Sequence, residues 1–130
     1  MEKIRFSVPL HVDMPTRKQP GRKWYLNLNR YRNTHFLVLA KAKRDYSKSV
    51  EIPKFKADSI KVTYWLYPKD ARLTDIRNVT DVVNKFLLDA IVTKGYIPDD
   101  NYNHVCHGGD YFVKIDRDYP RVDVEIEILK

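Results

Sequence analysis

The chain has 130 residues and a formal net charge of +7, and 43% of its residues are hydrophobic. This composition excludes an intrinsically disordered chain, its short apolar runs exclude a membrane-spanning helix, and its single cysteine, Cys106, excludes an intrachain disulfide. We therefore expect one soluble, cytoplasmic domain over residues 1–130 with no membrane partner, and the excess of Lys and Arg favours a polyanionic partner such as nucleic acid.

The N-terminal half is predicted to contain one strand, a basic loop, a second strand-like segment and a helix. Apolar and polar residues alternate over residues 4–8, which is typical of a strand with one buried face. Prolines, a glycine and four cations make 15–23 a basic loop, and 24–28 returns to strand-like composition. Helical spacing of apolar residues then predicts a helix that begins at Asn33 or Thr34 and ends near residue 50.

The C-terminal half is predicted to contain three strands and one long helix. Alternation over 60–67 indicates a strand, and a single apolar stripe over 79–93 indicates a helix that Gly95 ends. Two further strands are expected over 111–115 and 122–128. This order of elements predicts an α+β fold, in which two helices pack on one face of a mixed sheet of four or five strands.

Carboxylates gather around the second predicted helix. Asp75 lies before the helix, Asp81 lies near its first turn, and Asp99 and Asp100 lie on the turn after it. If that turn folds back along the helix, the acids would converge, and a few carboxylates together with a substrate phosphate are what Mg²⁺ prefers. Lys85 follows Asp81 by one helical turn, so its ammonium could stabilise charge on a scissile phosphate.

Each of these residues also has a structural interpretation. Asp75 and Asp81 could compensate the positive end of the helix dipole. Together with Lys85 and Asp89, Asp81 could also form an ordinary exposed ladder of charges four residues apart. The acids of 99–101 could simply belong to a turn. Spacing alone leaves both interpretations open.

The run KFLLDA from Lys85 to Ala90, followed by Gly95 and the pair Asp99–Asp100, resembles the RusA family of Holliday-junction resolvases. Members of that family carry an Asp-x-Asp-Asn segment, then Lys-x-x-x-Asp-Ala, then a glycine and an Asp-Asp turn. The spacing from the lysine to the Asp-Asp turn matches without a gap. The similarity covers most of the chain in outline, and its specific motifs occupy residues 75–100.

The resemblance implies roles for individual residues. The metal-binding carboxylates would be Asp75, Asp81, Asp99 and Asp100. The catalytic set would be Asp75, Asp81 and Asp100, with Lys85 as the essential cation. The chain departs from the family pattern at Arg77, which stands where the second acid of Asp-x-Asp-Asn is expected. An insertion of about one helical turn would keep Asp75 at the site and let Asp81 supply the missing carboxylate.

The activity implied by the resemblance is that of a crossover junction endodeoxyribonuclease. Such an enzyme uses Mg²⁺, which Mn²⁺ could replace, to resolve Holliday junctions by phosphodiester hydrolysis in recombination and repair, and it leaves 5′-phosphate and 3′-hydroxyl ends. The implied partners are branched DNA and a second copy of the chain, because two symmetric cuts need two equivalent sites. The small size is compatible with a phage or prophage gene. The alternative is a non-catalytic branched-DNA-binding protein that lost cleavage through Arg77.

Basic residues in the N-terminal half are candidates for contacts with DNA phosphates. These residues are Arg17, Lys18, Arg22, Lys23, Arg30 and Arg32. Contacts of this kind are largely independent of sequence and weaken with salt. A merely solvated basic loop is the alternative for 15–23.

Overall fold

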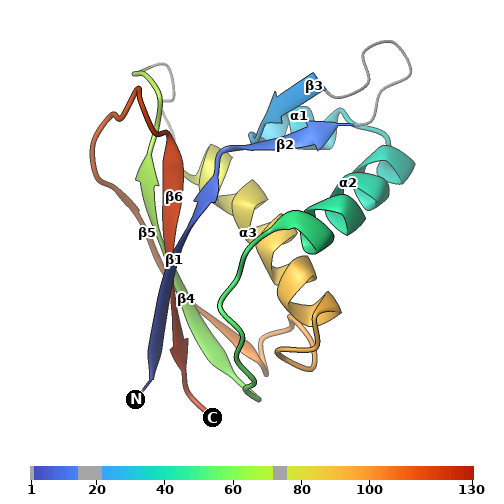
Figure 1. Ribbon diagram of the computed structural model, residues 1–130, viewed down its shortest axis with the longest axis vertical. Coiled ribbons are helices and arrows are strands. Elements are labelled where there is room, and N and C mark those ends of the chain that lie inside the picture. The colour runs from blue at the N-terminus through green and yellow to red at the C-terminus, as the bar shows by residue number, and fades with distance from the viewer. Residues whose placement is uncertain (1, 15–21, 72–75) are drawn as a thin grey trace.

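The computed structural model describes residues 2–14, 22–71 and 76–130 (Figure 1). Its elements, in chain order, are β1 (Lys3–Pro9), β2 (His11–Met14), β3 (Arg22–Tyr25), α1 (Leu28–Arg32), α2 (Phe36–Ser49), β4 (Ile60–Tyr67), α3 (Arg77–Thr93), β5 (Val105–Phe112) and β6 (Arg121–Ile128). Three of the residues named above, Arg17, Lys18 and Asp75, lie outside the described residues. For Arg22 and Lys23, the backbone alone is described.

The main sheet has four strands in the order β1-β6-β4-β5, and β2 and β3 form a separate antiparallel pair. Strand β6 runs antiparallel to both β1 and β4, whereas β5 runs parallel to β4. Parallel neighbours require a crossover connection, and α3 provides it. The helix therefore starts near the C-terminal end of β4 and ends near the start of β5 (Figure 1). The predicted α+β class with a mixed sheet is confirmed.

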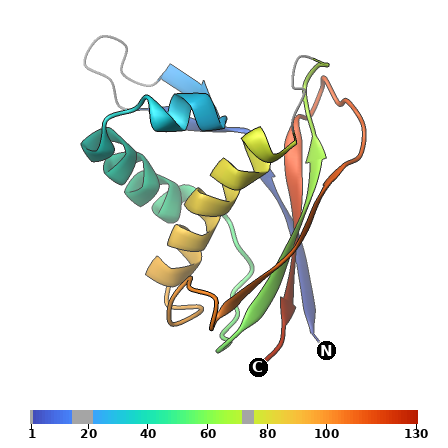
Figure 2. The same cartoon turned by 180° about the vertical axis from the view of Figure 1, so that it is seen from behind.

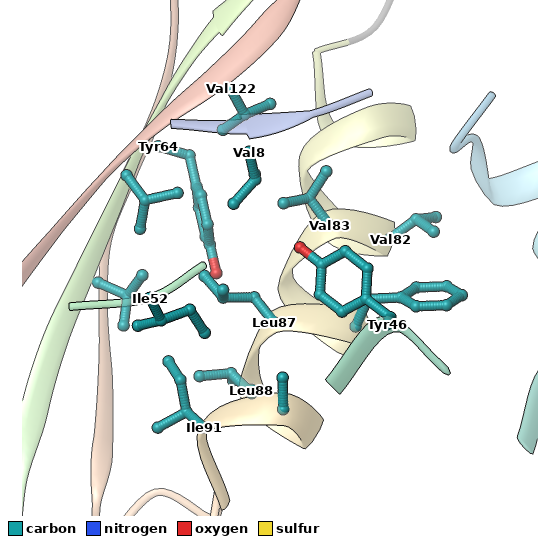
Figure 3. Close-up of a cluster of buried hydrophobic side chains, with 14 of the residues drawn as sticks. Val8, Tyr46, Ile52, Tyr64, Val82, Val83, Leu87, Leu88, Ile91 and Val122 are labelled. Carbon is teal, nitrogen blue, oxygen red and sulfur yellow. The ribbon is translucent and has the colours of Figure 1, made fainter. Parts of the chain in front are cut away.

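Helix α3 lies along one face of the sheet, and α2 packs against α3 on the side away from the sheet (Figures 1 and 2). The apolar stripe of α3 explains this position, because Val83, Phe86 and Leu87 are fully buried. Tyr64 of β4 enters the same core from the sheet (Figure 3). None of the helices in the described ranges is long and apolar enough to cross a membrane.

Gly95 ends α3 as predicted, in a left-handed conformation with φ of 77°. Its amide donates to the carbonyl of Val92 at 2.9 Å, and the amide of Tyr96 donates to the carbonyl of Ile91 at 3.0 Å. This pair of bonds is a Schellman motif, which satisfies carbonyls that the last helical turn leaves free. The helix itself begins at Arg77, two residues earlier than the apolar stripe predicts.

Several predicted boundaries are wrong. Arg22 and Lys23, expected in the basic loop, belong to β3, which ends at Tyr25, and Leu28, expected in the strand-like segment, begins α1. The strand expected over 111–115 is β5, which begins at Val105 and ends at Phe112, because paired glycines inside it hide its alternation. The N-cap of α2 is His35, whose Nδ1 accepts from the Leu37 amide at 3.2 Å. Asn33 and Thr34 belong instead to the end of α1, a five-residue helix too short to show a period, where the Thr34 hydroxyl donates to the Arg30 carbonyl at 2.6 Å.

Candidate functional site

Two carboxylates from different elements approach one guanidinium at the N-terminal end of α3. Arg77 Nε lies 3.8 Å from Asp81 Oδ1, one helical turn further along α3. The same nitrogen lies 3.9 Å from Oδ2 of Asp110, which comes from β5. Arg77 is two-thirds exposed, so screening by water keeps these ion pairs weak. Asp75, the first acid of the predicted set, lies outside the described residues just before this helix.

Asp110 is the most buried member of this group. Its side chain is 8% exposed, and its Oδ2 lies 2.9 Å from His107 Nε2. Its other oxygen, Oδ1, is buried and has no hydrogen-bond partner among the described residues. A buried carboxylate oxygen without a partner is costly, so the surroundings of Asp110 fit an additional positive group that the described residues do not supply.

A bulge in β5 places Asp110 and His107 on the same face of the sheet. Val62 pairs with His107, but its neighbour Thr63 pairs with Gly109, so Gly108 is an extra residue in β5. Alternation would put residues three apart on opposite faces, and one inserted residue cancels that difference. Gly109 has φ of 129°, which favours glycine. Both side chains consequently face α3.

The signal for this feature was present in the sequence as two adjacent glycines. Glycines inside a strand pattern mark a bulge or a close backbone contact, but no bulge is predicted above at Gly108 and Gly109. Asp110 and His107 are therefore absent from the predicted site residues.

Tyr64 connects α3 to the sheet below the carboxylates. It is fully buried, and its hydroxyl donates to Oδ1 of Asn84 on α3. Burial raises the pKa of Tyr64, and the nearby Tyr46, Asp110 and Asp81 raise it further. The phenol thus stays neutral and remains a donor to Asn84. The carboxylates of Asp81 and Asp110, which contribute to the raised pKa of Tyr64, both belong to the N-terminal end of α3.

Lys85 lies one helical turn after Asp81 on α3 and contacts α1. Its ammonium lies 5.5 Å from the ring centroid of Tyr31 on α1, and Lys43 of α2 approaches the same ring at 5.3 Å. Attraction of a cation by an aromatic face accounts for this orientation. Lys85 and Asp81 share one face of α3, as predicted, and the contact with Tyr31 draws the Lys85 ammonium toward α1.

Asp99 and Asp100 lie at the opposite end of α3 from Asp81. More than three helical turns, about 18 Å along the axis, separate Asp81 from the last residue of the helix. Asp99 Oδ1 accepts from the Asp100 amide at 2.7 Å, and this bond holds the pKa of Asp99 below its ordinary value. The turn after α3 does not fold back along the helix, so these two acids do not join Asp81 and Asp110 in one chain.

Two of the predicted phosphate contacts, Arg30 and Arg32, lie in the last turn of α1 and are exposed. Helix α1 lies beside the N-terminal part of α3 (Figure 2). The two arginines are therefore on the side of the molecule that also carries Arg77 and Asp81.

Comparison with known proteins finds no family model that matches this chain and no curated protein that is similar to it. Within the described ranges, no three His, Cys, Asp or Glu side chains gather closely enough to form a metal-binding group. Asp81 and Asp110 form a pair through their shared contact with Arg77.

Proposed function

We propose that this protein is a Mg²⁺-dependent DNA endonuclease of the RusA type, which cuts the phosphodiester backbone of branched DNA and resolves four-way junctions. The observation that carries the proposal is the buried Asp110 carboxylate, whose unpartnered Oδ1 lies on the same side of the sheet as Asp81 and at the same end of α3. Arg77, which contacts both carboxylates, joins the two elements at this position.

The donor set fits the chemistry of Mg²⁺. This ion takes oxygen ligands and is commonly held by one or two carboxylates, with waters and substrate phosphate as the remaining ligands. Asp81 and Asp110 would supply two carboxylates, and Asp75 a third. When bound, the ion would stabilise charge on the reacting phosphate and lower the pKa of a water molecule.

The remaining polar groups of the site have roles that follow from their contacts. Arg77 offers a guanidinium fork, which suits a phosphate with two free oxygens, and it would move from the carboxylates to the phosphate when a cation binds. His107 holds Oδ2 of Asp110 and so fixes the plane of that carboxylate. In this proposal Asp110 is the carboxylate that stands beside Asp81 in the same chain, a position that Asp100 of that chain does not reach.

The charge of the chain supports a DNA partner. A net charge of +7 favours a polyanion, and Arg30 and Lys69 lie near the first turns of α3, the helix that carries Asp81. The basic residues Arg17, Lys18, Arg22 and Lys23, the last two at the start of β3, would add phosphate contacts. Junction resolution also calls for two sites related by symmetry, which a homodimer provides.

The test is cleavage of a labelled four-way DNA junction with and without Mg²⁺. We expect wild type to make paired symmetric nicks that need Mg²⁺ and that DNA ligase can reseal. Asp81→Asn and Asp110→Asn should lose cleavage and retain junction binding. Asp45→Asn serves as the matched control, because Asp45 is an exposed acid on α2 paired with Lys41, and it should cut as wild type does.

Two results would overturn parts of this proposal. Tight binding of the junction by wild type without any nick would favour the non-catalytic branched-DNA-binding protein. Full cleavage by Asp110→Asn would remove this carboxylate from the site.

A further inference from the structure

A hollow of about 240 Å³ lies between the β2–β3 pair, α1, and the first turns of α3. Its floor is apolar, because Leu10, Leu26 and Val79 are each at most 4% exposed. The floor residues come from three separate segments of the chain, namely the β1–β2 connection, the β3–α1 connection and α3, so the hollow does not depend on one loop. It opens on the side of α3 that faces α1, whereas Asp110 lies on the side that faces the sheet.

The walls of the hollow combine one aromatic ring with two cations. Tyr25 is 40% exposed, and the ammonium of Lys69 lies 4.3 Å from its ring centroid. Arg30 adds a guanidinium to the same rim, and Asp70 adds a carboxylate that can accept hydrogen bonds. An apolar floor with an exposed aromatic ring suits a flat heterocycle, and two neighbouring cations suit the phosphate attached to it.

The position of the hollow relates it to the carboxylate pair. Val79 and Asp81 belong to the same first turns of α3 but lie on different faces of the helix. A helix with its side chains is about 10–12 Å across, a distance that about three nucleotides of a B-form strand cover, or fewer when the strand is extended. A strand whose phosphate lay at Asp81 and Asp110, and which ran around α3 toward α1, would place a base at the hollow within about three nucleotides of that phosphate.

We infer that this hollow binds one unpaired base of the DNA strand, together with its phosphate, beside the point of cleavage. The inference rests on the proposed function for its location and deepens it by assigning a base-binding subsite. Tyr25 stacks on the base, Lys69 and Arg30 hold the phosphate, and Asp70 accepts from an exocyclic amino group. Branched DNA has unpaired or easily opened bases at its crossover, which is the kind of base that a pocket can accept.

The experiment measures binding of deoxyadenosine 5′-monophosphate to the full chain without Mg²⁺, by the shifts of backbone amide resonances. Its purine can stack and its amino group can donate, and 2-deoxyribose 5-phosphate is the probe that lacks the base. We expect the nucleotide to shift the amides of Leu26, Asn27 and Asp70, and the sugar phosphate to bind at least about tenfold more weakly.

Three variants make the result specific. Tyr25→Ala should weaken nucleotide binding about tenfold, and Tyr25→Phe should preserve it because the ring remains. Tyr102→Ala is the control, because Tyr102 is 90% exposed in the turn after α3, and it should bind as wild type does. Unchanged amide resonances elsewhere in the spectrum show that each variant is folded.

The outcomes separate this inference from the proposed function. Equal binding of nucleotide and sugar phosphate, or no shift at these amides, would overturn the base subsite even if the junction is cut. Nucleotide binding that Tyr25→Ala weakens would support the subsite, and if no junction were then cut with Mg²⁺, the failure would belong to the proposed nuclease activity alone.

Discussion

His107 and Asp110 are three residues apart on β5, yet His107 Nε2 lies 2.9 Å from Asp110 Oδ2. The bulge at Gly108 makes this contact possible, since a regular strand would direct the two side chains to opposite faces. The candidate site therefore depends on a backbone irregularity in an edge strand as much as on the residues that line it.

The bulge itself can be tested with Gly108→Ala. A Cβ at this position would meet Thr63 Oγ1, which can rotate away, and the Val62 carbonyl oxygen at 3.0 Å, which cannot. We expect a loss of about 2 kcal/mol in the free energy of unfolding, measured by urea denaturation, together with loss of cleavage as Asp110 shifts.

Gly95→Ala is the comparison for this change. Nothing lies within 4 Å of a Cβ at Gly95, and its φ of 77° alone would cost about 1 kcal/mol. If Gly108→Ala were no more destabilising than Gly95→Ala and still cut DNA, close packing at the bulge would not be what positions Asp110.

Two buried tyrosines should respond oppositely to loss of the hydroxyl (Figure 3). Tyr64 donates to Asn84 Oδ1, so Tyr64→Phe leaves that oxygen unpaired and should cost about 1–2 kcal/mol. The hydroxyl of Tyr46 is buried and has no hydrogen-bond partner among the described residues, so Tyr46→Phe should be neutral or stabilise by up to about 1 kcal/mol. Urea denaturation of both variants checks this, and equal destabilisation would contradict it.

Acid should weaken one contact of the segment between β5 and β6. The Tyr119 amide donates to Asp116 Oδ1 at 3.0 Å, and Arg121 donates to Oδ2 at 2.9 Å. These bonds lower the pKa of Asp116, the amide bond first and Arg121 after it. Because the folded-state pKa is depressed, the stabilisation is complete above the ordinary value of about 4 and disappears as the pH falls through the folded value.

The measurement compares wild type with Asp116→Asn by urea denaturation across this range. We expect wild type to be more stable near neutral pH, with a difference that shrinks steadily below about pH 4. Asp118→Asn is the matched control in the same segment and should follow wild type at every pH. A stability difference for Asp116→Asn that did not change with pH would argue against the ionised carboxylate as its source.

Asp100 can act at the carboxylate pair only from a second copy of the chain, because α3 separates it from Asp81. The resemblance and the geometry then agree if each site of a dimer takes Asp81 from one copy and Asp100 from the other. We expect Asp81→Asn and Asp100→Asn to be inactive alone. When the two variants are mixed and refolded together, half of the dimers should contain one copy of each variant, and each such dimer has one complete site. About a quarter of all sites should therefore be active, and they should make single nicks in a labelled junction.

Other results of this mixing experiment are equally informative. Cleavage by Asp100→Asn alone at the wild-type rate would exclude Asp100 from the reaction. If both variants and their mixture were inactive, Asp100 would act within its own chain, in the turn that Asp99 stabilises.

Sequence patterns predicted the elements with a clear period. The apolar stripe of α3 and the alternation of β4 and β6 locate the core, because burial of one face leaves a repeat that the sequence retains. Helix α1 has five residues and no buried one, so it leaves no such repeat. In β5 the glycine bulge breaks the alternation, and Asp110 was hidden with it.

The candidate site was predictable in part. Clustering of acids pointed to the start of α3, where the structure places Asp81. Spacing along the helix could not predict that Lys85 would lie over Tyr31, because that ring comes from another element. Spacing along the helix also could not predict Asp110 as a site residue, because Asp110 belongs to β5 and only the tertiary structure brings β5 to this end of α3.

The first and last strands, β1 and β6, pair so that Lys3 lies opposite Glu127. Both ends of the chain consequently lie together at the end of the sheet where β4 and β5 begin, far from the start of α3 (Figure 1). Labels, affinity tags or a surface tether attached at either end would thus leave the Asp81–Asp110 face open to solvent. Immobilised protein could therefore be presented to branched DNA with that face outward, which is the orientation that single-molecule measurements of cutting require.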